Sequence, residues 1–344
     1  MERTDWGSDG RKADSESYGM NKTFFGDCRT TMRDLKARGV RVQCCVTSPP
    51  YYGLRDYGHT GQIGLEKTPA EYVAALVEVF EGVRDLLADD GVLWLNLGDS
   101  YNAAGRDGHG TRTGYKQGTN RASATKADNC RPSVDWLKPK DLIGIPWRVA
   151  FALQAAGWYL RQDVIWHKPN PMPESVTDRC TKAHEYLFLL TKSERYFWDA
   201  EAMREPFASE YSTDAIEKAG GAGGERPDGD NFNKEARKNG AMTPRTRAER
   251  AALLNPAGRN RRSVWTVPTQ PYSGAHFAVF PAALIEPCIL AGSRPGDLVI
   301  DPFMGSGTTA QVAQALGRQW IGCELNPEYA PLQQARTAQA ALAL

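Results

Sequence analysis

Long hydrophobic runs are missing from this sequence of 344 residues. None approaches the roughly 20 consecutive apolar residues that a membrane-spanning helix needs. Residues 1–20 are polar and charged, without the apolar stretch of a secretory signal peptide, and we expect them to form a disordered tail. These absences exclude a membrane-spanning helix and predict a cytoplasmic location.

Cysteine is also scarce, and the spacing of the cysteines does not indicate disulfide bonds. The seven cysteines are an odd number, include no CxxC pair, and place Cys44 directly beside Cys45. This pattern is neither a disulfide framework nor a zinc signature, and it favours a reducing compartment. The dipeptides His167-Lys168 and His184-Glu185 have no third ligand at a suitable spacing, so we expect no metal site.

Positive charge is unevenly distributed, although the formal net charge is only +1. Residues 105–131 hold six basic residues against two acidic ones, and residues 234–262 hold nine against two. Both stretches are rich in glycine, asparagine and threonine, a composition typical of loops. Basic loops of this kind suit a phosphate backbone. The alternative is that they are solvated insertions without a partner.

Short apolar runs alternate with segments of helical periodicity, which predicts an α/β fold with a largely parallel sheet. Strands are predicted at 42–47, 92–97, 159–166, 185–191, 298–300 and 320–323. Helices are predicted at 71–87, 141–156, 281–291 and 307–316.

The segment 298–309 combines a strand, a glycine turn and the start of a helix. Glycines let the backbone approach a ligand closely, and a helix N-terminus offers free N–H groups. Glu324 ends the next predicted strand, 19 positions after Gly305, where a carboxylate can accept hydrogen bonds from both ribose hydroxyls of an adenosine cofactor. A nicotinamide dinucleotide would suit the same geometry, but the turn is not G-x-G-x-x-G.

Four motifs together resemble those of the DNA amino-methyltransferases, the family that methylates cytosine N4 or adenine N6. TSPPYYG at 47–53 resembles motif IV and DPFMGSGTT at 301–309 resembles motif I. FFGDC at 24–28 resembles the motif III element, and HFAVFP at 276–281 resembles motif X. The order, with motif IV first and motifs X and I near the end, is similar to the β group of the family.

The resemblance implies a circularly permuted, Rossmann-like class I methyltransferase sheet of seven strands. Residues 21–199 would form the first part of the catalytic domain, with a basic insertion at 101–135. Residues 200–262 would form the target-recognition region, and residues 263–344 the cofactor-binding part. The chain would then begin and end on neighbouring strands, which makes the permutation physically reasonable.

S-adenosylmethionine is the cofactor that the resemblance implies. Asp27 would bind its adenine amino group, Glu324 its ribose, and Phe280 with Pro281 would close over it. The other implied cofactor-binding residues are Cys28, Asp301, Phe303, Gly305, Ser306, Gly307, Thr308 and Asn326.

The Ser48–Tyr51 turn suits methyl transfer to an exocyclic amine, whose lone pair is delocalised into the ring. Two acceptors aimed at the amino hydrogens favour the pyramidal, nucleophilic form, and Ser48 Oγ with the Pro49 carbonyl could supply them. Pro49 and Pro50 stiffen the segment. The base must leave the duplex, and Tyr51 could stack on it for about 1–3 kcal/mol. The bland alternative is a strand-terminating turn.

Serine at the first position of this motif resembles the cytosine-N4 enzymes, and aspartate or asparagine the adenine-N6 enzymes. We therefore expect cytosine N4, with adenine N6 as the alternative. Cytosine C5 chemistry needs a thiolate, and Pro287-Cys288 lies in an apolar helix where Cys288 is expected to be a core residue. The sequence also admits an inactive DNA-binding protein with this fold, or a methyltransferase acting on RNA or a small amine.

Double-stranded DNA is the expected partner. If strand 92–97 runs parallel to the strand ending at Ser48, the basic insertion lies at the catalytic edge of the sheet. Whether a restriction endonuclease or a second copy accompanies the chain stays open. The residues expected to contact DNA, including three that could fill the gap left by the flipped base, are Tyr52, Arg55, Tyr57, Arg112, Lys116, Arg121, Arg259, Arg261 and Arg262.

Overall fold

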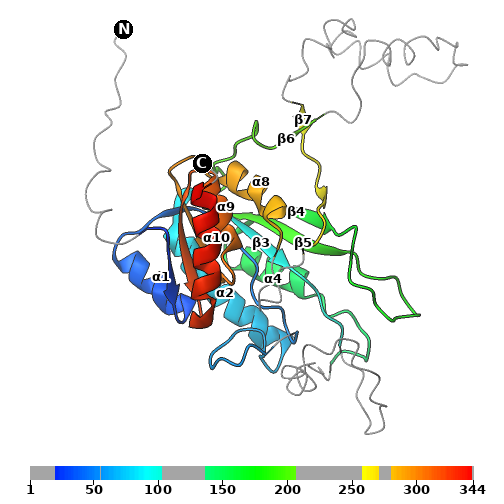
Figure 1. The fold of residues 1–344 in the computed structure, drawn as a ribbon. Helices are drawn as coiled ribbons and strands as arrows, with labels where there is room; N and C mark the ends of the chain where they lie inside the picture. The colour runs from blue at the N-terminus through cyan, green and yellow to red at the C-terminus, as the bar shows by residue number, and fades with distance from the viewer. Residues whose placement is uncertain (1–19, 55, 103–135, 207–257, 271–279, 343–344) are drawn as a thin grey trace, which may run out of the picture. The chain divides into compact units, whose positions relative to one another are not determined.

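The computed structural model describes residues 20–54, 56–102, 136–206, 258–270 and 280–342, with side chains to residue 338. The chain divides into two compact units, Met1–Asp199 with Ser263–Leu344, and Ala200–Arg262. The larger unit contains the sheet and its helices (Figure 1). Of the smaller unit, the structure describes the paired strands β6 (Arg204–Glu205) and β7 (Arg259–Asn260).

One mixed sheet organises the larger unit, with strand order β1-β10-β9-β2-β3-β5-β4-β8. The run from β1 to β3 is parallel throughout, whereas β5 is antiparallel to both its neighbours. The described sheet has eight strands rather than the expected seven, because β8 adds in parallel beside β4. The strands are β1 (Lys22–Phe25), β2 (Val42–Thr47), β3 (Leu87–Leu97), β4 (Tyr159–His167), β5 (His184–Thr191), β8 (Val264–Thr266), β9 (Leu298–Asp301) and β10 (Gln319–Glu324).

Helices cover both faces of this sheet (Figure 1). α1 (Cys28–Ala37), α2 (Pro69–Leu86) and α4 (Ile145–Ala155) pack in succession on one face. α8 (Ala282–Gly292), α9 (Thr308–Ala315) and α10 (Ala330–Leu342) pack in succession on the other, with the short η1 (Pro327–Tyr329) before α10. A strand covered on both faces is apolar throughout. Thus Cys45 joins the core beneath α1 and α2, while its neighbour Cys44 lies against α8.

Local signals explain where the main helices begin and end. Thr68 and Glu71 form a capping box at the start of α2, with Pro69 in the first turn. α4 starts at Ile145, later than expected, after Gly144 with φ 78°. α8 ends on Gly292 itself rather than before it. A Cβ at this position would lie 2.5 Å from a Val92 methyl carbon, so the packing of α8 against β3 requires glycine here.

The first and last strands of the sheet in chain order, β1 and β10, are parallel neighbours. This arrangement is what a circular permutation requires. Since β1, β10, β9, β2 and β3 are all parallel, their carboxyl ends share one edge. The turns after Phe25, Glu324, Asp301, Thr47 and Leu97 therefore converge.

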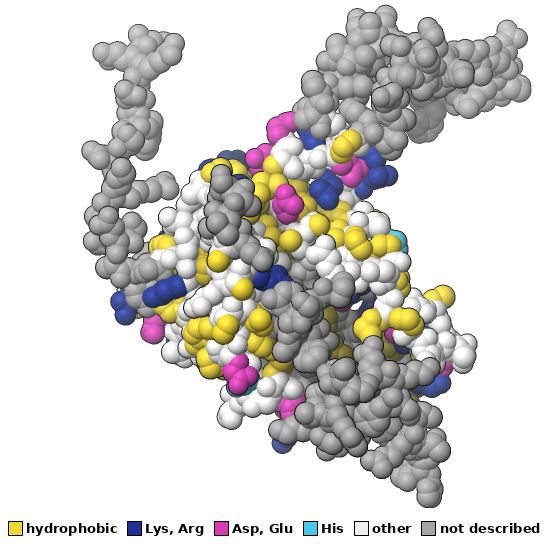
Figure 2. Space-filling view, viewed as in Figure 1, with side chains coloured by type: hydrophobic (Ala, Val, Ile, Leu, Met, Phe, Trp, Pro, Cys, Tyr) yellow, Lys and Arg dark blue, Asp and Glu magenta, His cyan; other side chains and the backbone are white. Residues whose placement is uncertain are grey.

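Apolar side chains also reach the surface. Met172 is 82% exposed and Val264 60% exposed. On the face drawn in Figure 2, hydrophobic side chains are interspersed with charged and other polar ones. Among the helices that the structure describes, none has both the length and the apolar character to cross a membrane.

Candidate active site

Two of these turns, the Ser48 turn after β2 and the glycine turn after β9, are connected by a side-chain hydrogen bond between the ends of their strands. Thr47 Oγ1, at the end of β2, donates a 2.6 Å hydrogen bond to Asp301 Oδ1, at the end of β9. Thr309 Oγ1 donates to Asp301 Oδ2 at 2.7 Å, and the Phe303 N–H donates to Oδ1 at 2.9 Å. The turn that begins at Ser48 thus starts beside the glycine turn.

Asp301 holds the two turns in place from inside the protein. Its side chain is only 2% exposed, and both carboxylate oxygens accept hydrogen bonds from the chain itself. Burial raises its pKa to about 6, in spite of the three donors. These contacts support a positioning role for the Asp301 side chain, while the contact with the cofactor that the resemblance implies stays a prediction.

The glycine turn has a backbone that other residues adopt only with strain. Gly305 and Gly307 have φ of 52° and 90°. A Cβ on Gly307 would also lie 3.2 Å from Gln333 Cα of α10. The Gln333 amide nitrogen donates to the Gly305 carbonyl at 2.7 Å, so α10 supports the turn from behind. α9 begins directly after, at Thr308.

Glu324 lies beside this turn at the end of β10. Its carboxylate accepts hydrogen bonds from the Gly305 N–H at 2.7 Å and the Asn326 N–H at 2.8 Å. Burial raises the pKa of the Glu324 carboxyl. Asn326 is itself buried and caps η1. The structure thus brings Glu324, Gly305 and Asn326 together, while the ribose contact stays a prediction.

Asp27 follows β1, the next strand along the edge, where the Gly26 N–H donates to the Glu324 carbonyl at 2.8 Å. The Asp27 carboxylate caps α1 and forms an ion pair with Arg29 at 2.7 Å, which lowers its pKa. Its side chain remains 41% exposed. Cys28 is buried, and burial raises the pKa of its thiol to about 12, so the thiol stays protonated.

The remaining predicted cofactor residues lie around the same edge. Thr308 Oγ1 accepts from Arg336 at 2.6 Å, Pro281 caps α8, and Phe280 is half-buried. Ser306 is 2% exposed, and its hydroxyl has no hydrogen-bond partner among the described residues. A buried polar atom without a partner is costly unless a ligand satisfies it. The site therefore combines a glycine turn that a ligand can approach closely, an unpartnered Ser306 hydroxyl and the Glu324 carboxylate, and these groups fit a polar, adenosine-type cofactor.

The Ser48–Tyr51 turn is held from below by α2. Tyr72 Oη donates to the Pro50 carbonyl at 2.8 Å. The Gly53 N–H donates to the Gly64 carbonyl at 2.8 Å. These bonds fix the backbone on both sides of Tyr51, which is what a preorganised site needs.

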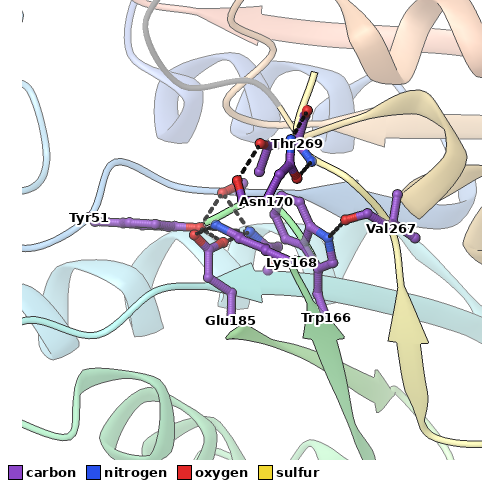
Figure 3. A network of polar contacts seen from close by, with 9 residues as sticks. Tyr51, Trp166, Lys168, Asn170, Glu185, Val267 and Thr269 are labelled. Atoms are coloured by element: carbon purple, nitrogen blue, oxygen red, sulfur yellow. Dashed lines mark hydrogen bonds and ion pairs between the residues drawn. The ribbon is translucent and has the colours of Figure 1, made fainter. Parts of the chain in front are cut away.

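Tyr51 is the centre of a polar network drawn in Figure 3. Its hydroxyl donates to Glu185 Oε2 at 2.6 Å and accepts from Asn96 Nδ2 at 2.7 Å. Asn96 Nδ2 also lies 2.9 Å from Glu185 Oε2, and the other carboxylate oxygen of Glu185 accepts from Lys168. Ser48 Oγ lies 3.4 Å from both Tyr51 Oη and Asn96 Nδ2. Burial and the Glu185 charge raise the pKa of Tyr51 well above its ordinary value.

Sequence reasoning placed Glu185 and Lys168 at strand ends but gave them no role. β5 begins where β3 ends, because the two strands are antiparallel, with Tyr186 opposite Leu97. β4 ends beside the start of β5, with His167 opposite His184. The antiparallel direction of β5 brings Glu185, near its start, to the edge where β3 ends, whereas Lys168 follows the carboxyl end of β4, which runs in the same direction as β3. The direction of β5 is not readable from the sequence.

The residues expected to contact DNA divide into three groups. Tyr52 corrects one expectation, because it is 1% exposed and its ring packs 5.4 Å from that of Tyr72, so it cannot enter a duplex from this position. Tyr57 is half-buried, with its N–H bound to Gln62. The residues that lie outside the described ranges are Arg55, Arg112, Lys116 and Arg121.

The arginines of the smaller unit are described beside β7. Arg259 and Arg262 each form a 2.8 Å ion pair with Glu205, and Arg261 lies between them in the chain. Their DNA contacts stay predictions. In the part of the chain that the structure describes, no three His, Cys, Asp or Glu residues are grouped as metal ligands.

Comparison with known proteins gives a consistent result. The profile of the N6/N4 methyltransferase family, described as DNA methylase, matches residues 42–335. The type II methyltransferase M.Cfr9I of Citrobacter freundii is 47% identical over 306 residues, which are 89% of this chain and 84% of that protein.

Solved structures show the same fold. The cytosine-N4-specific PvuII DNA methyltransferase aligns with a TM-score of 0.54 at 18% identity, over 92% of this chain and 85% of its own. A putative DNA modification methylase from Thermus thermophilus, solved in complex with S-adenosyl-L-methionine, aligns with a TM-score of 0.53 at 22% identity. That alignment covers 93% of this chain and 94% of the other.

Proposed function

Because this chain belongs to the N6/N4 DNA methylase family, we propose that it transfers a methyl group to the exocyclic N4 of a flipped-out cytosine in duplex DNA. The chain is an S-adenosylmethionine-dependent DNA methyltransferase of the type II class. The finer statement, the base and atom methylated, is our proposal. The observation that supports methyl transfer at this site is the Thr47–Asp301 bond between the strand that precedes the Ser48 turn and the strand that precedes the glycine turn.

The residues of the glycine-turn edge would hold the cofactor. Glu324 would accept hydrogen bonds from the ribose hydroxyls, and Asp27 would accept one from the adenine amino group. The buried Ser306 hydroxyl, which has no partner among the described residues, would form a hydrogen bond with the cofactor. Gly305 and Gly307, with φ of 52° and 90°, would let the backbone of the turn approach it closely. When bound, S-adenosylmethionine supplies an electrophilic methyl group on a positively charged sulfur.

The catalytic turn would prepare the target amine. Ser48 Oγ and the Pro49 carbonyl would accept hydrogen bonds from the two amino hydrogens and so favour the pyramidal nitrogen. The proline pair and the Tyr72 bond to Pro50 fix these acceptors before the base arrives. Holding the amine in line with the methyl group contributes a further large part of the acceleration. Tyr51 would stack on the base and offset its unstacking from the duplex.

Serine at position 48 favours cytosine N4 over adenine N6, as in the family members that it resembles. We extend the proposal to the basic segments: residues 101–135 and 200–262 would contact DNA, the latter as the target-recognition region. Their excess of arginine and lysine suits phosphate contacts, which would position the duplex, and guanine contacts, which would read it.

Nucleoside mass spectrometry of DNA from cells expressing the protein tests this function. The expected result is N4-methylcytosine, at a much lower level in cells that carry a Ser48→Ala variant. N6-methyladenine in its place would overturn the choice of base but keep the enzyme class. Unmodified DNA, from a soluble protein that binds S-adenosylmethionine, would indicate an inactive DNA-binding protein. Sequencing that locates the modified base would supply the recognition site for the assays below.

A further inference from the structure

Glu185 is the main hydrogen-bond acceptor in the network around Tyr51, and the proposed function assigns it no role. Its carboxylate receives donors from Lys168, Tyr51 and Asn96. The Glu185 and Lys168 side chains are only 15% and 17% exposed. Lys168 also lies 4.2 Å from the centre of the Trp166 ring, whose N–H donates to the Val267 carbonyl at 2.8 Å (Figure 3). The carboxylate is thus held from a second strand, β4.

An ionised carboxylate only accepts hydrogen bonds, and this fixes the direction of every bond in the network. Tyr51 must donate its single proton to Glu185, so its oxygen can only accept from other groups. Asn96 must turn its NH2 toward Glu185 and Tyr51. The Asn96 amide oxygen is then buried with no hydrogen-bond partner among the described residues, which is unfavourable.

The fixed direction of these hydrogen bonds also determines how Ser48, the residue nearest the substrate in our proposal, can bond to Tyr51. Tyr51 Oη, with its own proton committed to Glu185, offers a lone pair toward the Ser48 hydroxyl. The 3.4 Å separation is long for a hydrogen bond, so Ser48 is the loosely held end of the network. A Ser48 proton turned to Tyr51 leaves a lone pair of Ser48 Oγ for the incoming amine.

We propose that Glu185, held by Lys168, is a positioning residue that keeps Ser48 a hydrogen-bond acceptor by fixing the direction of the Tyr51 hydroxyl. This inference rests on the proposed function, since it assigns to Glu185 the orientation of the group that contacts the amine. In this arrangement Glu185 would contact neither the cofactor nor the base.

Glu185→Gln is the primary test, because glutamine keeps the shape but can donate to Tyr51 and so reverse the network. We expect kcat on a duplex with the identified site to fall about 10- to 100-fold, the range for losing a hydrogen bond to a charged group. KM for DNA and for S-adenosylmethionine should stay within about twofold, because binding does not use Glu185. Glu185→Asp, which keeps the charge, should retain more activity than Glu185→Gln.

A double-mutant cycle with Tyr51→Phe separates positioning from independent action. If Glu185 acts through the Tyr51 hydroxyl, the second substitution adds little to the first. Base extrusion gives a readout other than activity: with 2-aminopurine at the target position, Glu185→Gln should show the wild-type fluorescence increase. Glu81→Gln, at an exposed position of α2, is the matched control and should behave as wild type.

Three results would overturn the inference. The first is wild-type kcat for Glu185→Gln. The second is an additive loss in the cycle, which would mean that Glu185 acts without Tyr51. The third is a joint loss of thermal stability, binding and 2-aminopurine signal, which would indicate a purely structural residue. Failure of the proposed function is separate, because the unaltered protein would then produce no N4-methylcytosine.

Discussion

Thr47 Oγ1 lies 2.6 Å from Asp301 Oδ1, although the two residues are 254 positions apart in the chain. The bond links the last residue of β2 to the last residue of β9, and both side chains are buried. It therefore couples the stability of the sheet edge to the relative placement of the Ser48 turn and the glycine turn. Several expected outcomes depend on it.

Replacing Thr47 by valine keeps the β-branched shape and removes the donor. We expect the free energy of unfolding to fall by about 1.5–3 kcal/mol, the range for a hydrogen bond to a charged group. Urea denaturation measures the loss. Thr23→Val, at a half-buried position of β1, is the control and should change little. An unchanged midpoint for Thr47→Val would mean that the bond contributes nothing.

Because the folded-state pKa of Asp301 is raised, we expect the free energy of unfolding to decrease as pH rises. Its ordinary pKa is 3.8, and burial raises the folded value to about 6. Between these values the folded state holds the proton that the unfolded state has released, so the free energy of unfolding decreases with pH. The expected decrease from this one group is about 3 kcal/mol. Urea denaturation at several pH values should show a smaller decrease for Asp301→Asn than for the wild type. Equal slopes would contradict the raised pKa.

Ser48→Ala should lower kcat by about 10²–10³, as loss of one preorganised electrostatic group does elsewhere. Affinity for S-adenosylmethionine, measured by isothermal titration calorimetry, should be unchanged, because the glycine turn is intact. Ser193→Ala, beyond the opposite end of β5, is the control. Normal single-turnover methylation by Ser48→Ala would remove Ser48 from the mechanism.

Glu324→Gln should weaken binding of S-adenosylmethionine about 10- to 100-fold, since the charged acceptor of the proposed ribose contact is lost. The amide also cannot accept from both the Gly305 and Asn326 N–H groups as the carboxylate does. Calorimetry on the purified variant measures the change. Glu328→Gln, exposed in η1, serves as the control. An unaltered Kd for Glu324→Gln would reject the ribose contact.

Gly98→Ala tests the placement of the Tyr51 ring. A Cβ at position 98 would lie 2.5 Å from Tyr51 Cε2, so the ring must move. We expect a stability loss of about 1–3 kcal/mol, typical of overpacking, together with reduced methyl transfer. Gly82→Ala, whose tightest contact is with the flexible end of Met32 in α1, should be tolerated. Full activity in Gly98→Ala would show that the position of the ring is unimportant.

Much of the fold could be predicted because its determinants are local. Alternating apolar runs and helical periodicity located the central strands and helices to within a few residues, apart from β3 and α4. β3 begins five residues earlier than expected, and the structure gives α4 a start set by the left-handed conformation of Gly144. The eighth strand, β8, was missed because three residues carry too little pattern to indicate a partner.

The site could be predicted from the sequence only where its functional residues are neighbours in the chain. By itself the sequence determined the Ser-Pro-Pro-Tyr turn, the glycine turn and the acidic end of β10, because each is a run of neighbouring residues with a fixed backbone requirement. Tertiary structure alone decided that Tyr52 is buried, that Asp301 bridges two strands, and that Glu185, paired with Lys168, reaches Tyr51. The physical reason is that strand direction and register, set by packing across the whole sheet, determine which distant side chains meet.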